Sequence, residues 1–139
     1  MLEILYVCQT IGWTLYAGPM IAFSIMAYTD KNFYKSFSHF GVGFGLSLTL
    51  WIYSTIAIQY LSQGHFFPNI RENLWIPVAI VMWISNIKLE IWTLDPIRKS
   101  KEPIVPSIYL QSLRSHLTIH ASLIALVQIL FALNSHLNS

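Results

Sequence analysis

Charged residues and cysteine are what this sequence has least of. Only 10% of its 139 residues are charged and 55% are hydrophobic, whereas soluble domains carry about 25% charged residues. This composition indicates a lipid-facing membrane protein, organised as one domain over residues 1–139. The single cysteine, Cys8, excludes an internal disulfide and lies in an apolar run, so we expect a small buried hydrophobic residue there.

The motifs of soluble catalysis are also missing. The chain has no nucleophile elbow, no phosphate-binding glycine loop, no CxxC and no HExxH. The formal charge is only +2, and the basic residues fall in connecting segments, which gives nucleic-acid binding little support. The sequence therefore favours a protein that is not an enzyme.

Four apolar stretches are long enough to cross a hydrocarbon layer of about 30 Å. Lipid offers the backbone no hydrogen-bond partners, so these stretches must be helices. We predict an all-α membrane protein, a four-transmembrane-helix up-down bundle with short loops. The predicted helices cover residues 2–28, 39–60, 74–94 and 107–133. The first lacks the features of a cleaved signal peptide, and we expect it to remain in the mature chain.

The distribution of basic residues predicts the orientation. The first and third loops, with the start of the fourth helix, hold Lys31, Lys35, Arg98, Lys99, Lys101 and Arg114, whereas the second loop holds only Arg71. The positive-inside rule then places loops one and three in the cytoplasm and both termini outside. The membrane we expect is a bacterial inner membrane or its equivalent.

The second predicted helix begins with closely spaced glycines. Gly41 and Gly45 form a GxxxG pair, a spacing that lets another helix approach closely in a membrane. We interpret the pair as a helix-packing surface, and not as part of a reaction centre.

The third helix carries polar residues toward its end, and ionisable residues inside a spanning helix need partners. Lys88 is near enough to the end for its ammonium group to reach the interface. Glu90 lies where the helix dipole disfavours an anion, and Asn86 shares its face. With Asp95 and Arg114, these residues form the expected structural polar cluster.

Histidines supply the candidate cofactor site. His116 and His120 are four positions apart on one helix face, a spacing that can hold a metal or present a haem ligand. His39 and Glu90 fall in the same half of the bundle. The candidate haem or copper ligands are therefore His39, His116 and His120, and the candidate metal ligands are Glu90, His116 and His120.

The depth of Glu90 in the membrane, compared with that of residues at the start of the fourth helix, predicts its partner. Its carboxylate is expected to face the bundle interior and to contact at least one of Arg114, His116 and His120. If the partner is only Arg114, the site is a structural ion pair. If two histidines converge on Glu90, a metal or haem site is indicated.

The end of the third helix, EIWTLDPIRK, and the later stretch YLQSLRSHLTIHASLIALVQ resemble the family of domain of unknown function 4149, which includes the transmembrane protein 205 type. The matching residues are Leu94, Asp95, Pro96, Arg98, Leu113, Arg114 and His120. In this chain Ile97 is an extra residue between the proline and the arginine of that pattern. The resemblance implies four spans and a poorly characterised membrane protein.

The stretch WTLYAGPMIAFS in the first helix is similar to one shared by the copper-resistance protein D and HemJ-type families. The HemJ type uses a histidine in helix one and a lysine early in helix three for oxidation in the haem pathway. This chain has Cys8 and Gln9 at the first place, and its Lys88 is late in helix three. The resemblance therefore gives little support to that oxidation.

Three functions remain open. The first is a non-catalytic subunit or partner-binding bundle in a membrane assembly, with other membrane subunits, a second copy and lipid as partners. The second is a haem- or copper-binding membrane protein that uses the histidines above. The third is a transporter, for which four short spans leave little room.

Overall fold

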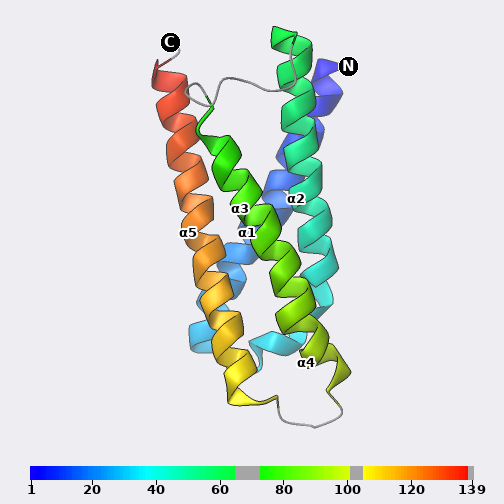
Figure 1. Cartoon of the computed structure of the whole chain (residues 1–139), viewed down its shortest axis with the longest axis vertical. Helices are drawn as coiled ribbons and strands as arrows, with labels where there is room; N and C mark the ends of the chain where they lie inside the picture. The colour runs from blue at the N-terminus through cyan, green and yellow to red at the C-terminus, as the bar shows by residue number, and fades with distance from the viewer. Residues whose placement is uncertain (65–72, 101–104, 138–139) are drawn as a thin grey trace.

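The computed structural model is an antiparallel bundle of long helices (Figure 1). It describes residues 1–64, 73–100 and 105–137, and side chains as far as residue 133. The helices are α1 (Leu2–Thr29), α2 (Phe33–Gln63), α3 (Trp75–Leu89), the π-helical turn η1 (Glu90–Leu94), α4 (Asp95–Lys99) and α5 (Ser107–Leu137).

Four helical segments are long and apolar enough to cross a membrane: Leu2–Thr29, Phe33–Gln63, Trp75–Lys99 and Ser107–Leu133. The third is one rod made of α3, η1 and α4. The predicted fold class, an all-α bundle of four spans, is confirmed. Both termini lie at one end of the bundle and α4 at the other (Figure 1). The chain is therefore a small polytopic membrane protein.

The first predicted loop is too long. It was expected to run from Thr29 to Phe37, but α2 already begins at Phe33. Phe33 and Phe37 are fully buried, and their spacing of four residues puts both on the inner face of a helix. Because these two rings are buried, the helix begins inside the segment that was predicted to be the first loop.

The third span also ends later than expected. Asp95 was expected to begin a loop because Pro96 disfavours helix, yet the rod continues to Lys99. The amide of Asp95 donates to the carbonyl of Glu90, five residues back, so the chain makes a π-helical turn just before the proline. The wider turn accommodates the ring, which would otherwise crowd the preceding turn of a regular helix.

The second helix ends beyond its predicted limit as well. It runs to Gln63 instead of Tyr60 and stops at Gly64, whose φ of 81° is left-handed. Glycine adopts this conformation without the penalty of a Cβ. Most of the second predicted loop, and with it Arg71, lies outside the described residues, as does Lys101 of the third.

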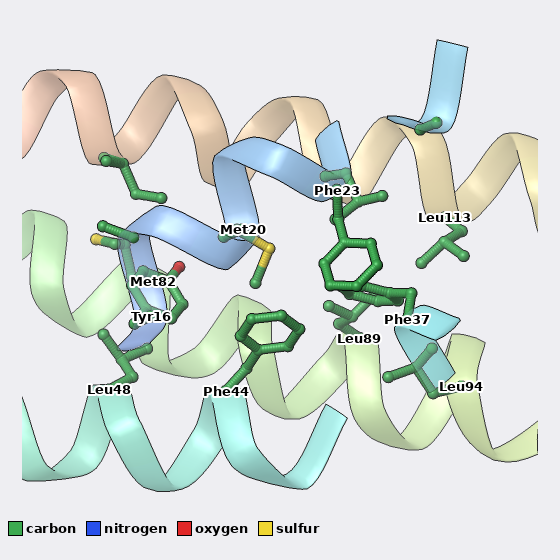
Figure 2. Close-up of a cluster of buried hydrophobic side chains, with 14 of the residues drawn as sticks. Tyr16, Met20, Phe23, Phe37, Phe44, Leu48, Met82, Leu89, Leu94 and Leu113 are labelled. Carbon is green, nitrogen blue, oxygen red and sulfur yellow. The ribbon is translucent and has the colours of Figure 1, made fainter. Parts of the chain in front are cut away.

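Aromatic and aliphatic side chains from all four spans fill the core (Figure 2). Phe23 of α1 meets Phe37 and Phe44 of α2, with ring centroids 5.1 and 6.1 Å apart. Leu94 and Leu113 close the same layer from η1 and α5 and are fully buried. This packing fixes the end of the bundle where the polar residues of the third span lie.

The backbones of α1 and α2 come close together at Gly12. A Cβ added to Gly12 would lie 2.7 Å from the amide nitrogen of Trp51 and 2.8 Å from the carbonyl oxygen of Ser47. No side chain fits there, so the two helices depend on this glycine for their contact.

Candidate functional site

Glu90 has a cationic partner, but it is not one of those expected from the sequence. Its Oε1 forms an ion pair with Nη1 of Arg98, on the same helical rod. The prediction that Glu90 contacts Arg114, His116 or His120 is therefore wrong. In a regular α-helix two residues eight positions apart lie about 80° apart around the axis. The extra residue of the π turn brings them onto one face.

The ion pair also joins the rod to α2. Nε of Arg98 donates to the carbonyl oxygen of Ser38 at 3.0 Å, and Nη2 donates to the same oxygen. Oδ1 of Asp95 lies 3.9 Å from Nη1 of Arg98, and Oδ2 of Asp95 lies 3.6 Å from Nζ of Lys99. Arg98 thus satisfies a carbonyl and a carboxylate together at the end of the bundle.

Gly41 makes room for this ion pair. A Cβ on Gly41 would collide with Oε2 of Glu90, with Nη2 of Arg98 and with Leu94. Gly45, one turn further along α2, lies against Asn86, whose Nδ2 would be 3.1 Å from an added Cβ. The GxxxG pair therefore faces α3 and η1 of its own chain and accommodates polar side chains there.

Lys88 and Arg114, the two cations of the expected polar cluster, do not pair with Glu90. Lys88 is exposed, with Nζ 5.9 Å from the ring centroid of Trp92. Arg114 donates from Nε to the carbonyl oxygen of Ala27 at 2.7 Å and lies over the ring of Phe33. Arg114 thus ties α5 to α1, at a distance from Glu90. The structure divides the expected cluster into separate contacts.

His120 lies in the middle of the bundle, fully buried. Its Nδ1 forms a hydrogen bond with the hydroxyl of Tyr16, and its Nε2 lies 3.1 Å from Oγ of Ser85. Tyr16 is also fully buried. The trio links α1, α3 and α5, and buried networks of this kind rigidify a core when every member is satisfied.

The three candidate haem or copper ligands do not converge. His39 is exposed on α2, and Nδ1 of His116 bonds to the carbonyl of Ser112 on its own helix. Both ring nitrogens of His120 are engaged, so a metal would have to displace Tyr16 or Ser85. Across the ranges that the structure describes, no three His, Cys, Asp or Glu side chains are grouped to hold a metal. The three histidines named from the sequence therefore do not together form a haem or copper site.

A groove of about 390 Å³ lies between α2 and α3. Glycine and apolar residues form most of its walls, with the polar side chains of Asn86 and Glu90 among them. The lining residues are Gly41, Val42, Gly45, Leu46, Thr49, Trp83, Asn86, Ile87, Glu90 and Ile91. We call this feature the α2/α3 groove.

Two polar groups at the groove are unsatisfied. Asn86 is only 5% exposed as a residue and lines the groove, and the hydrogen bonds within the described residues include none from its side-chain amide. Oε2 of Glu90 is buried and likewise lacks a partner within the described residues. Buried polar groups of this kind are costly unless something binds them.

Sequence reasoning missed Gly12, Tyr16, Ser85 and the pairing role of Arg98. Tyr16 and His120 are 104 positions apart, and no local pattern connects them. Gly12 lacks the GxxxG spacing by which Gly41 and Gly45 were recognised. Arg98 was assigned to a loop, because the proline before it conceals the continuing helix.

Comparison with protein-family models, with curated proteins and with solved structures finds no match to this chain.

Proposed function

We propose that this chain is a non-catalytic, partner-binding membrane bundle whose partner occupies the α2/α3 groove. The observation that carries the proposal is the side chain of Asn86, which lines the groove from a spanning helix and forms no hydrogen bond among the described residues. Polar side chains at this depth form hydrogen bonds between helices in membranes. A partner in the groove would complete what the bundle leaves unpaired.

The polar side chains inside the bundle favour a partner-binding role over a catalytic one. His120, which the sequence offered as a cofactor or metal ligand, is engaged on both sides by Tyr16 and Ser85. Arg98 is held by Glu90 and by the backbone of α2. These groups are committed to holding the bundle together, whereas the groove is lined by Asn86 and by Glu90, whose Oε2 lacks a partner within the described residues.

The expected setting follows from the sequence. A subunit of a larger assembly in a bacterial inner membrane, with loops one and three in the cytoplasm, stays our proposal. We also propose, from the sequence, that the chain is related to the family of domain of unknown function 4149. This proposal rests on the Leu-Asp-Pro sequence near the end of the third span and on the helix that contains His120.

A photo-crosslinking amino acid at Leu46 tests the proposal. Leu46 lines the groove and is 67% exposed. Leu15, on the lipid-facing side of α1 at similar depth, is the matched control. Irradiation of intact membranes should give a discrete protein adduct from position 46 that Asn86→Leu weakens, and none from position 15. Equal behaviour of the two positions would rule out an occupied groove.

A further inference from the structure

We propose that the partner in the α2/α3 groove is a second copy of this chain, which docks through the lipid-facing side of its α5. This inference rests on the proposed function and names its partner. Three observations support it: a line of small polar residues on α5, the depth at which those residues lie, and the chemistry of the two unsatisfied groups.

The outer face of α5 carries small polar side chains where lipid-facing residues are usually apolar. Ser115, Thr118 and Ser122 are all exposed, and their spacing of three and four residues puts them on one helix face. Small residues let helices approach closely in membranes. We call these three residues the α5 stripe.

The depths of stripe and groove agree. The contact between Ser85 and His120 places these residues at one level. Glu90 and Ser115 each lie five residues, about 7.5 Å, from that level toward the α4 end of the bundle. By the same reckoning, Asn86 lies between the levels of Thr118 and Ser122. Two copies in one bilayer share their depth, so stripe and groove meet in register.

The chemistry is complementary. All three hydroxyls of the stripe donate to carbonyls four residues back on α5, and Thr118 is also bonded to the hydroxyl of Tyr28 of its own chain. The oxygens of Ser115 and Ser122 are left able to accept from the amide of Asn86. Ser115 can instead turn its proton to Oε2 of Glu90, and a bond to a charged acceptor is stronger than one to a carbonyl. A lipid acyl chain has no group that could satisfy either atom.

The contact joins two different surfaces, so it is head-to-tail. The groove belongs to α2 and α3, whereas the stripe belongs to α5. Two copies related in this way each keep one unused surface, and further copies add until a ring closes. A face-to-face dimer of grooves would join two concave surfaces, which leaves the amides of Asn86 apart.

Disulfide trapping between differently tagged copies tests this inference. In a Cys8→Ala background, one copy carries Leu46→Cys in the groove and the other Ile119→Cys beside the stripe. Position 119 is 48% exposed and lies within about 1.5 Å of the level of Leu46, by the contacts of Gly45 and Ser85. The mixed pair should form a disulfide dimer in membranes, and a copy with Leu15→Cys in place of Ile119→Cys should not.

Two outcomes overturn the second-copy assignment, and they differ in what they say of the groove. If position 46 gives a photo-adduct with another protein but no disulfide with position 119, the groove binds a different chain. If position 46 gives neither product, the proposed function fails as well. Adding Asn86→Leu to the trapping pair should lower the disulfide yield severalfold, and an unchanged yield would also contradict the inference.

Discussion

At the scale of single residues, the chain places its polar side chains in pairs that secure one helix to another. Arg98 binds a carboxylate of its own rod and a carbonyl of α2. His120 binds side chains of α1 and α3. In lipid these contacts matter because an unpaired polar group cannot form a hydrogen bond with water instead.

The ion pair of Glu90 and Arg98 should be worth more than an exposed one. Its side chains are 24% and 31% exposed, so it falls between surface pairs, at about 0–1 kcal/mol, and buried ones, which cost about 3–5 kcal/mol to break. We expect Arg98→Leu to lower the free energy of unfolding in mixed micelles by about 2 kcal/mol. Glu90→Gln combined with Arg98→Leu should recover about half of that. A double variant that is no more stable than Arg98→Leu would contradict the ion-pair account.

Tyr16 and Tyr28 provide a matched comparison for the buried trio. Both hydroxyls are hydrogen-bonded, but Tyr16 is fully buried and Tyr28 is 67% exposed. Tyr16→Phe leaves a buried nitrogen of His120 without a partner, which costs about 1–3 kcal/mol. Tyr28→Phe should change the free energy of unfolding by less than about 0.5 kcal/mol. Thermal unfolding in detergent measures both, and equal losses would remove the special role of the trio.

At the scale of helices, the contacts between elements depend on where glycine lies. Gly12 of α1 is enclosed by the backbone of α2, whereas an added Cβ on Gly43 of α2 would meet nothing within 4 Å. Gly12→Ala should cost about 1–3 kcal/mol, because backbone neighbours cannot move aside as a side chain can. Gly43→Ala should be neutral, or stabilising by up to about 1 kcal/mol through helix propensity. Denaturation of the two variants side by side tests the crossing, and similar effects would refute it.

The π-helical turn explains why the elements could be predicted better than the site. Apolar length alone located all four spans, because a bilayer demands such stretches. That Glu90 needs a cation also followed from its place in the third helix. Its partner did not, because helical periodicity puts Arg98 on a different face and Pro96 suggests that the helix has ended. The π turn accommodates Pro96 and lets the helix continue, and the buried side chains of Leu94, at its end, and Ile97, beyond it, hold this continuation against the core.

The core trio illustrates a second limit. The one-turn spacing of His116 and His120 was visible in the sequence, but only packing shows that His116 bonds its own helix while His120 is enclosed between two others. Periodicity identifies a face, and it does not tell what covers that face. For the same reason, the metal site expected from the histidines had no counterpart in the geometry.

At the scale of the whole molecule, both termini lie at the same end of the bundle and the short α4 at the opposite end (Figure 1). The basic residues near α4 predict that this end is cytoplasmic. In a Cys8→Ala background, a membrane-impermeant thiol reagent added outside should label Ser139→Cys and leave Ser100→Cys unlabelled until the membrane is opened. Labelling of position 100 from outside would reverse the orientation.

Asn86 connects the stability of one copy to its association with another, and it gives the most direct test of the account. In an isolated bundle Asn86 is 5% exposed and its side chain forms no hydrogen bond among the described residues, so Asn86→Leu should raise the free energy of unfolding of the monomer by about 1 kcal/mol. In liposomes the same change should weaken association severalfold, measured by energy transfer between labelled copies at a fixed lipid ratio. A stabilised monomer that associates less is the result we predict. A destabilised monomer, or unchanged association, would show that Asn86 serves the fold alone and that the groove binds no second copy.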